Sequence, residues 1–552
     1  VSLDNAAVVA SGPADSPEAG MVAGKVVFRS AGAMSVRNSW MKSLSADSVA
    51  GGSGQTFEIE SSSFTDRLSV SVGGAITADN MLAIRATGAG GLPTDWPGFS
   101  ASLALTSLSD VRIRGAIAPD NSNFKGVTTD DSTKTISGSL YVQGENVDAS
   151  AVKASGYASL NAVSDITIPR SAGAVTGISA DGVYLTPGKG LSVEGDVIST
   201  GAIDFELWSS GAETSFNVGS NPAVRTTVSG NDVTFYSDAP MSVANATVIS
   251  TGNLEFITRD DMAVGSDALN KARISAVGDA RFMASRSLEM GNTQVTADTV
   301  TMTANAGSAE GGWGYWGHTL AGPASITISS SADIGAAGAL SASIRSGVGN
   351  DFSTSGNIVI DGALSGSSVS ITNEGPTGGN VALGATATSS ITGSGTSLVI
   401  AATAGGNVVN ASPTFINAGP GRSMVYTNDV SSSSGLYAAE DSHHFAQTYT
   451  GSDPIYAAAG KWTFYAETPT VNLAADALSK VYGSADPVLT FSVSGLAFAG
   501  DSSSFSATLS RAAGEAVANG PYAIAVSGVS NAMGYTVGTI TDSSLTITPK
   551  AI

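Results

Sequence analysis

Hydrophobic and polar residues alternate along most of the chain in short runs. VTFYS (233–237), LEFIT (254–258) and ARFMA (280–284) are examples, and Gly, Asn, Asp and Ser separate such runs. Alternation with a period of two places the apolar side chains on one face of a β-strand. Two segments, 34–44 and 266–272, are candidates for a short helix or turn. The pattern predicts an all-β fold built from many short strands.

The apolar positions repeat at a nearly constant interval between residues 233 and 304. In the first column, Phe235, Phe256, Phe282 and Met302 follow one another at intervals of 21, 26 and 20 residues. Two further columns keep the same order, and they contain Met241 with Val243, Met262 with Val264, Leu288 with Met290, and then Val248, Ile274 and Val295. The five-residue excess lies between the second and third columns of one turn, at SDALNK (266–271).

Three columns that share one insertion predict a coil with three short strands in each turn. A β-sandwich also has alternating strands, but three of its columns would not share one insertion. We therefore favour a long parallel, right-handed β-helix over residues 1–420, where similar strands such as SLYVQG (139–144) and GNIVIDG (356–362) recur. At about 20–25 residues per turn and a strand spacing of about 4.8 Å, such a rod is roughly 80–100 Å long.

The period breaks near residue 420. Aromatic residues gather in GPGRSMVYTND (419–429) and GKWTFYAETP (460–469), with Tyr437, Phe445 and Tyr449 between them. We expect residues 421–470 to form a cap or connector, because the open end of a coil exposes an unpaired strand edge. Residues 471–552 form a last unit of short strands.

This last unit resembles a known module. ALSKVYGSADPVLTFSVSGLAFAGD (477–501), GPYAIAVSGV (520–529) and LTITPKA (545–551) follow one another as in the MBG (mostly β, Gly-rich) module of large bacterial surface proteins. The connector is similar to the segment after the β-helix in filamentous-haemagglutinin-like exoproteins of two-partner secretion, with Ser423 where a Trp is often found.

The resemblance implies a secreted bacterial adhesin or stalk at the cell surface, used for attachment or biofilm formation. The implied partners are a host or bacterial surface glycan or protein, the chain itself in a filament, and an outer-membrane secretion pore of the two-partner type. Two alternatives stay open: a polymerising subunit of an extracellular filament or matrix, and a β-helical carbohydrate-active enzyme. The chain opens VSLDNAAVVA without a signal peptide and ends in ITPKAI, so we expect a processed or trimmed piece of a longer protein.

Charge and composition exclude several classes of function. The formal net charge of −21 argues against nucleic acid and anionic lipid as partners. The absence of cysteine excludes disulfides, thiolate metal sites and a cysteine nucleophile. No apolar run reaches the ~18–20 residues of a membrane span, so we expect no membrane insertion. HExxH, Walker A and GxSxG stretches are missing, and acids are scattered, whereas a glycosidase needs them paired. We expect no catalytic residues, no cofactor and no enzyme activity.

Two adjacent histidines are one candidate for metal binding. His443 and His444 lie next to Glu440 and Asp441 in the connector. We interpret the pair as a solvated turn, with a surface metal site or a sensor of mild acidification as the other hypotheses.

Carboxylate pairs are the other candidate. Asp130-Asp131 and Asp260-Asp261, the latter with Asp267 nearby, have the oxygen ligands that calcium prefers. The nonapeptide GGxGxDxUx calcium repeat is missing from the sequence. We therefore expect solvated turns and no metal site.

The loop AEGGWGYWGHT (309–319) is the candidate binding site. Trp313, Tyr315, Trp316 and His318 lie between glycines, after the strand that ends the first column. Exposed rings on such a loop would stack on sugars or pack against a partner protein. The alternative is that the rings fold back over the coil, since burial of each ring is favourable by a few kcal/mol.

Overall fold

The computed structural model describes the strands β1 to β11 within residues 1–139 and most of residues 140–551. The gaps after residue 140 are 145, 150–151, 155, 171–176, 210–213, 305–323, 346–354, 376, 394–395, 418–419, 437–441 and 452–459. The chain divides into two compact units, residues 1–340 with 347–349 and residues 341–346 with 350–552. No helix in the described ranges is long and apolar enough to cross a membrane.

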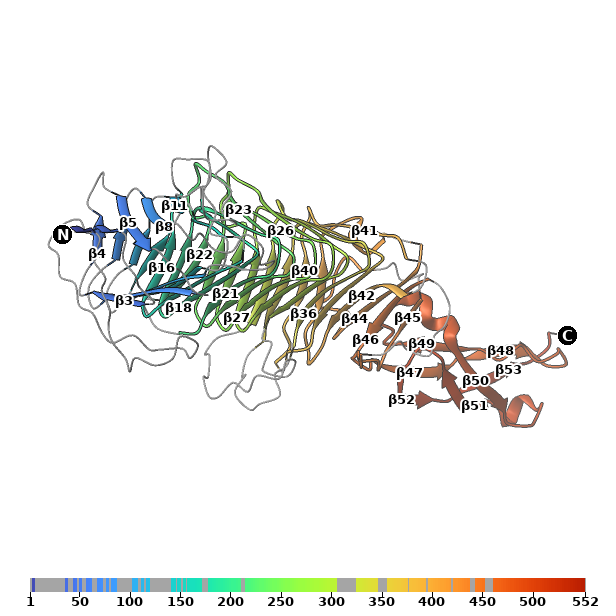
Figure 1. The fold of residues 1–552 in the computed structure, drawn as a ribbon. Helices are drawn as coiled ribbons and strands as arrows, with labels where there is room; N and C mark the ends of the chain where they lie inside the picture. Colours follow the sequence, from blue (N-terminus) through green and yellow to red (C-terminus); the bar gives the residue numbers. More distant parts are fainter. Residues whose placement is uncertain are drawn as a thin grey trace, which may run out of the picture. The chain divides into compact units, whose positions relative to one another are not determined.

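Parallel sheets run through the first unit (Figure 1). Sheet I contains β3 (Ser43–Ala46), β6 (Arg67–Val72), β9 (Ser102–Ser107), β12 (Leu140–Gly144), β15 (Tyr157–Ala162), β18 (Gly182–Pro187), β21 (Ile203–Leu207), β24 (Val233–Ser237), β27 (Leu254–Thr258), β30 (Ala280–Ala284) and β33 (Val300–Ala304). Sheet II contains β4 (Val49–Gly51), β7 (Ile76–Ala78), β10 (Val111–Ile113), β13 (Val147–Ala149), β16 (Asp165–Ile168), β19 (Gly190–Val193), β22 (Ser215–Val218), β25 (Met241–Val243), β28 (Met262–Val264), β31 (Ser287–Met290) and β34 (Ala324–Ile328).

Sheet III completes the turns of the coil from β12 onward. It contains β14 (Val152–Lys153), β17 (Gly177–Ala180), β20 (Asp196–Ser199), β23 (Thr226–Gly230), β26 (Ala246–Ser250), β29 (Ala272–Ala276), β32 (Thr293–Ala297) and β35 (Asp333–Ala336). A separate parallel sheet contains β1 (Ser2–Asp4), β2 (Ser35–Arg37), β5 (Thr56–Ser61), β8 (Met81–Ala86) and β11 (Ala116–Pro119). From β12 to β35 the chain visits sheets I, II and III in turn, and from β3 to β11 the separate sheet supplies the third strand of each turn. The first unit is therefore a parallel β-helix, as the column pattern predicts.

The three predicted columns are confirmed in register. Neighbours in the first column lie directly opposite each other on adjacent parallel strands, in the pairs Phe235–Phe256, Phe256–Phe282 and Phe282–Met302. The second and third columns follow the same rule, in the pairs Met241–Met262, Met262–Leu288, Val248–Ile274 and Ile274–Val295. Inward side chains of successive turns therefore stack.

Aromatic stacking fills the interior beneath sheet I. Phe235, Phe256 and Phe282 are fully buried. The ring centroids of successive members are 4.5 and 5.1 Å apart, and the rings are nearly parallel, at 4° and 6°. Each turn of a coil repeats the strand before it, so like side chains contact one another along the axis. Burial of each ring contributes about 1.5–3 kcal/mol.

The turn between β28 and β29 holds the five-residue insertion, as predicted. Asp267 accepts hydrogen bonds from the backbone N–H of Leu269 at 2.8 Å and from Nδ2 of Asn270 at 2.7 Å. Asn270 also donates to the carbonyl of Pro222 at 2.9 Å, which links the insertion to the loop between β22 and β23. The segment is a closed loop without a helix. The other candidate helix, 34–44, contains strands β2 and the start of β3.

The second unit begins with the same order of parallel strands. Its sheet II strands are β37 (Ser355–Ile360), β40 (Val381–Leu383) and β43 (Val408–Asn410), its sheet III strands are β38 (Ala363–Gly366) and β41 (Thr388–Ile391), and its sheet I strands are β39 (Ser368–Asn373), β42 (Thr396–Ala402), β44 (Arg422–Thr427), β45 (Ser442–His444) and β46 (Lys461–Tyr465). β36 (Ala339–Ile344) lies where the units meet in sequence, and the 3₁₀ turn η1 (Phe415–Asn417) follows β43. In the connector, β44 and β46 pair in parallel, and β45 pairs with β46. The predicted boundaries at residues 420 and 470 stay predictions.

The C-terminal module has two small sheets. One has the order β49 (Phe491–Ser494), β47 (Thr470–Ala475), β52 (Thr536–Thr541), and the other β48 (Leu478–Val481), β53 (Ser543–Thr548), β51 (Tyr522–Asn531), β50 (Phe505–Arg511). Two 3₁₀ turns, η2 (Ala499–Ser504) and η3 (Val517–Asn519), lie in its loops. Apolar side chains of both sheets, among them Ala475, Ile524 and Leu545, pack between them.

Candidate functional site

The predicted binding residues Trp313, Tyr315, Trp316 and His318 lie outside the described residues. Their role therefore stays a prediction. In the described part of the chain, polar and aromatic side chains gather at three other places: a groove on sheet II, a buried cluster at the module junction, and an ion cluster at the end of the module.

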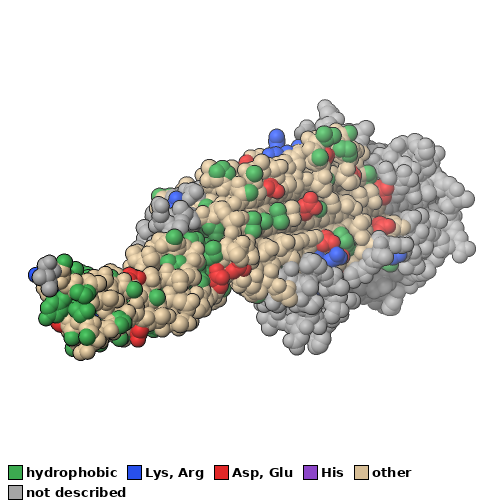
Figure 2. Space-filling model, turned by 180° about the vertical axis from the view of Figure 1, so that it is seen from behind, with side chains coloured by type: hydrophobic (Ala, Val, Ile, Leu, Met, Phe, Trp, Pro, Cys, Tyr) green, Lys and Arg blue, Asp and Glu red, His purple; other side chains and the backbone are tan. Residues whose placement is uncertain are grey.

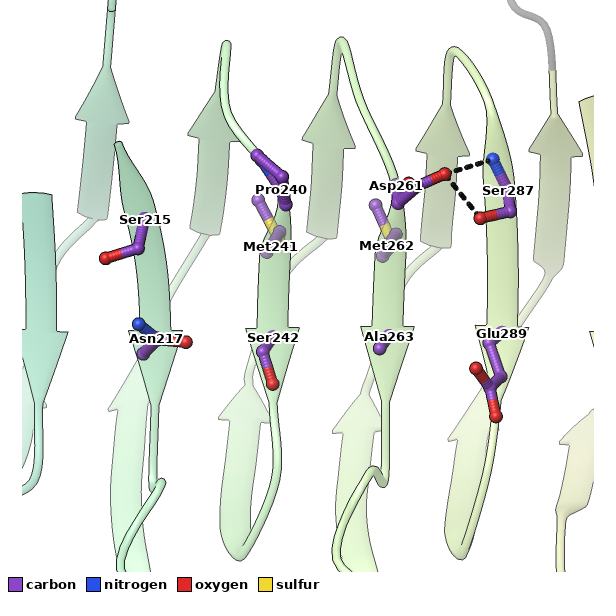
Figure 3. Close-up of a pocket in the computed structure, with 10 residues that line it drawn as sticks. All are labelled: Ser215, Asn217, Pro240, Met241, Ser242, Asp261, Met262, Ala263, Ser287 and Glu289. Atoms are coloured by element: carbon purple, nitrogen blue, oxygen red, sulfur yellow. Dashed lines mark hydrogen bonds between the residues drawn. The ribbon is translucent and has the colours of Figure 1, made fainter. Parts of the chain in front are cut away.

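The groove lies on the outward face of sheet II (Figure 3). Its volume is about 390 Å³, and β22, β25, β28 and β31 with the residues before them line it, through Ser215, Asn217, Pro240, Met241, Ser242, Asp261, Met262, Ala263, Ser287 and Glu289. Ala263 lies in register between Ser242 and Glu289. The short Ala263 side chain leaves a depression between the two longer ones (Figure 3). The groove is lined by both polar and apolar residues, with the exposed Glu289 at one side.

The carboxylates beside this groove are held by neighbouring side chains. Asp261 accepts hydrogen bonds from the backbone N–H of Ser287, at 3.0 Å, and from its hydroxyl. Arg286 pairs with Asp260 at 2.8 Å and with Asp261 at 3.5 Å. Asp267 binds within its own loop, where the hydrogen bond from Asn270 lowers the pKa of its carboxyl. The structure does not bring Asp267 to the pair.

Among the described residues, no group of three or more His, Cys, Asp or Glu side chains lies close enough together to hold a metal ion. Asp130 and Asp131, the other predicted carboxylate pair, lie outside the described residues, and so do Glu440 and Asp441. The guanidinium of Arg286 occupies the position beside Asp260 that a cation would need.

The adjacent histidines do not form a solvated turn, and that interpretation is wrong. They lie on strand β45, where alternation directs His443 inward, and its side chain is only 6% exposed. Its Nε2 lies 2.9 Å from Oδ2 of Asp501, which belongs to η2 of the module and is equally buried. The hydroxyl of Tyr535 donates to the same carboxylate oxygen. One buried carboxylate thus joins a connector residue to two segments of the module.

Aromatic rings surround this polar trio. Phe445 of the connector packs against Tyr535 at 4.6 Å between ring centroids and against Tyr465 at 5.4 Å. Phe498, just before η2, lies 4.6 Å from the His443 ring. Burial raises the pKa of the Tyr465 hydroxyl to about 12. The connector and the module therefore share one apolar core with a hydrogen-bonded centre.

His444 points away from this core. Its ring stacks on Trp462 and Phe464 of β46, at 5.7 and 6.2 Å between centroids and 14° from parallel in both cases. Burial, and secondly the neighbouring His443, lower the pKa of His444. His444 is therefore disposed to stay neutral at a pH where a free imidazole begins to gain a proton.

An ion cluster fixes the loops at one end of the module. The Lys480 side chain is 5% exposed, and its Nζ lies 2.5 Å from Asp486 and 2.6 Å from Glu515. Arg511 pairs with the same two carboxylates, at 2.7 and 2.5 Å. Arg511 and secondly Lys480 lower the pKa of Asp486 to about 2. The cluster links the loop after β48 to the loop after β50.

Apolar side chains are exposed on the loop that this cluster holds. Tyr482 is 51% exposed and Val488 is 83% exposed. Hydrophobic side chains gather at this end of the module, beside the C-terminus (Figure 2). The end therefore exposes a small apolar surface to solvent.

The comparisons with known proteins identify this module alone. Residues 471–546 match the family described as MBG domain (YGX type). Neither the curated proteins nor the solved structures gave a match. The matched region contains Tyr482-Gly483-Ser484 in the turn after β48, where Gly483 has a φ of +83° that favours glycine. The match supports the assignment of the C-terminal module, which shares a core with the connector, as an MBG domain of the YGX type.

Proposed function

We propose that this chain is a stalk of a secreted bacterial surface adhesin of the filamentous-haemagglutinin-like, two-partner type. The observation that carries the proposal is a parallel coil with in-register core columns, in a chain that ends in an MBG domain sharing a buried core with the preceding connector. Such a coil provides length and stiffness, and the junction fixes the domain to the connector.

The physical reason lies in the hydrogen bonding of the coil. β18, β21, β24 and β27 each pair with a parallel strand on both sides, so every turn is held by its two neighbours. Stiffness of this kind needs no ligand and no cofactor. The half-exposed Asp261, which lines the groove, is engaged by Ser287 and Arg286, which suits a structural turn better than acid–base chemistry. A structural role without enzyme activity is therefore our proposal.

The proposed location is outside the cell, on the bacterial surface, reached through an outer-membrane pore of the two-partner type. The proposed partners are surface glycans or proteins. The described face in Figure 2 carries scattered acidic side chains and few basic ones, which suits neutral or cationic partners better than anionic ones.

A surface-display experiment tests the proposal. Intact cells of the encoding organism would be probed with an antibody against the coil, with and without external protease, and the gene would be deleted. We expect a protease-sensitive surface signal and reduced attachment of the deletion strain at unchanged growth. A chain that stays inside the cell, or a deletion strain that attaches normally, contradicts the proposal.

A filament subunit is the second candidate, and the exposed Tyr482 and Val488 at the end of the MBG domain favour it. Electron microscopy of the purified chain at rising concentration tests it. Fibres that grow with concentration and vanish in a Tyr482→Ser, Val488→Ser variant support a filament, and single particles at all concentrations contradict it.

A further inference from the structure

Aromatic rings lie on the outward face of sheet I in four consecutive turns. Tyr157 and Tyr184 come from β15 and β18, Tyr236 comes from β24, and Trp208 directly follows β21. These strands are consecutive neighbours in the sheet. Trp208 is 48% exposed and Tyr157 is 46% exposed, so two of the rings are open to solvent, on strands that are separated by β18.

Neighbouring side chains fix the position of each ring. Tyr157 lies against Tyr184, at 5.7 Å between centroids and 61°. It fills the space above Gly182, where an added Cβ would come within 2.5 Å of the ring. Trp208 lies over Tyr236 at 4.5 Å and 32°, and its Nε1 donates to Glu206 at 3.0 Å. Little ordering entropy is left to lose when a ligand binds such rings.

Carboxylates occupy the outward positions between the ring pairs. Asp204 lies in register with Tyr184, and Glu206 lies in register with Tyr236. Burial raises the pKa of Asp204, and the charges of Glu206 and Asp232 raise it further, against a hydrogen bond from Thr234 that lowers it. The negative charges therefore repel one another, and a cation between them would relieve that repulsion.

A peptide cannot bind this face by adding a strand. β18 and β21 are both paired along each edge, so no backbone donors and acceptors remain for a further strand. Recognition has to use side chains: fixed aromatic faces, on which the C–H face of a sugar stacks, and carboxylates, which accept hydrogen bonds from hydroxyl and ammonium groups.

We propose that the face formed by Tyr157, Tyr184, Asp204, Glu206, Trp208 and Tyr236 binds a glycan that carries free amino groups, such as a glucosamine polymer. The sugar rings stack on Trp208 and Tyr157, and the ammonium groups pair with Asp204 and Glu206. The inference rests on the proposed surface role, because it names the class of glycan that the stalk would bind.

Binding of a defined oligosaccharide to the full chain tests the inference. Glucosamine hexasaccharide would be titrated against the chain by calorimetry at low salt, in parallel with its fully N-acetylated form and with hexalysine. The variants are Trp208→Ala, which removes a stacking surface, and Glu206→Gln, which keeps an acceptor for Trp208 and removes the charge. Tyr482→Ala, a change of an equally exposed ring in the MBG domain, is the control.

We expect the glucosamine hexasaccharide to bind, with affinity about tenfold lower in each of the two variants and unchanged in the control. Far-UV spectra and melting temperatures check that the variants remain folded. If the chain binds the N-acetylated form with the same affinity as the free amino form, the proposed pairing of ammonium groups with Asp204 and Glu206 is overturned. If hexalysine binds as tightly as the sugar, and Trp208→Ala does not change its affinity, the ligand is a basic peptide and the proposal of a glycan is overturned.

Absence of binding to the folded wild-type chain overturns the inference altogether. That result leaves the surface role intact if the chain is still detected on intact cells. A chain found only inside the cell contradicts the surface role, whatever the titration shows. Failure of the glycan proposal and failure of the surface role are therefore distinguishable.

Discussion

The contribution of a single residue to stability depends on whether strand alternation directs its side chain inward or outward. Phe256 and Glu255 are neighbours on β27, yet Phe256 is fully buried between two rings, while Glu255 forms an outward ion pair with Arg281 at 3.4 Å. The same rule separates His443 from His444 on β45. Whether a side chain is buried or exposed thus depends first on its odd or even position along the strand, and only then on its chemistry.

Phe256→Ala is expected to destabilise the coil by about 3–5 kcal/mol, because it opens a cavity in the stacked column. Glu255→Gln on the same strand should change stability by less than about 0.5 kcal/mol, since an exposed ion pair contributes little. Chemical denaturation of both variants measures the difference. Equal midpoints would mean that the column does not support the fold.

His444 gives the connector a pH dependence. Its pKa is lowered in the folded chain, so the folded state binds fewer protons than the unfolded state as the pH falls below about 6.5. Stability should therefore decrease from pH 7.5 to pH 5, and His444→Gln should decrease less over that range. Urea unfolding at several pH values checks this, and parallel profiles for the two proteins would refute it.

Elements of the coil are separated by turns whose length is free to vary. Val264 and Ala272 enclose the insertion, whereas the turns Ala244-Asn245 and Gly291-Asn292 have two residues at the equivalent place. The columns on either side of the insertion keep their register. Register is thus fixed by the stacked side chains and the ladders, and the turn length has little part in it.

Deletion of residues 266–270 combined with Lys271→Asn would convert the insertion into a Gly-Asn turn like that at 291–292. We expect the register of β29 with β26 and β32 to persist. The loss of the Asn270 bond to Pro222 should cost about 1 kcal/mol. Hydrogen exchange of these strands is the measurement. Loss of protection in β29 would show that the insertion sets the register.

The sequence predicts those parts of the fold in which neighbours along the chain determine neighbours in space. Phe235, Phe256 and Phe282 could be placed because each turn repeats the one before it. His443 could not, because its partner Asp501 is 58 residues away in a module with a different pattern. The outward rings Trp208 and Tyr236 were missed because an outward position carries no periodic signal. The roles of Trp313 and Trp316 stay predictions, since those residues lie outside the described ranges.

At the scale of the whole molecule, the junction decides whether the MBG domain and the connector behave as one body. Their shared core contains Phe445 and Tyr465 from the connector and Val471, Leu473 and Tyr535 from the module. The carboxylate of Asp501 satisfies both His443 and Tyr535 within this core. Removal of Asp501 takes away the carboxylate that both side chains contact.

Asp501→Ala should therefore destabilise the second unit by about 3–5 kcal/mol and expose the connector to protease. The double variant His443→Ala, Asp501→Ala should cost less than the sum of the single variants, by about 1–3 kcal/mol, because the pair acts as a unit. Thermal unfolding and limited proteolysis of the four proteins complete the cycle. Strict additivity would mean that the two side chains do not interact.

The strands of the coil lie across its axis, so the hydrogen bonds between turns lie along it. Tension applied to the two ends of the coil would break these bonds one turn at a time instead of loading them together. The turn from Phe235 to Phe256 contains 21 residues, and its release would add about 70 Å of extended chain. A pulled coil would thus lengthen in regular steps at nearly constant force, and it would yield gradually under flow while the turns that remain wound keep their structure.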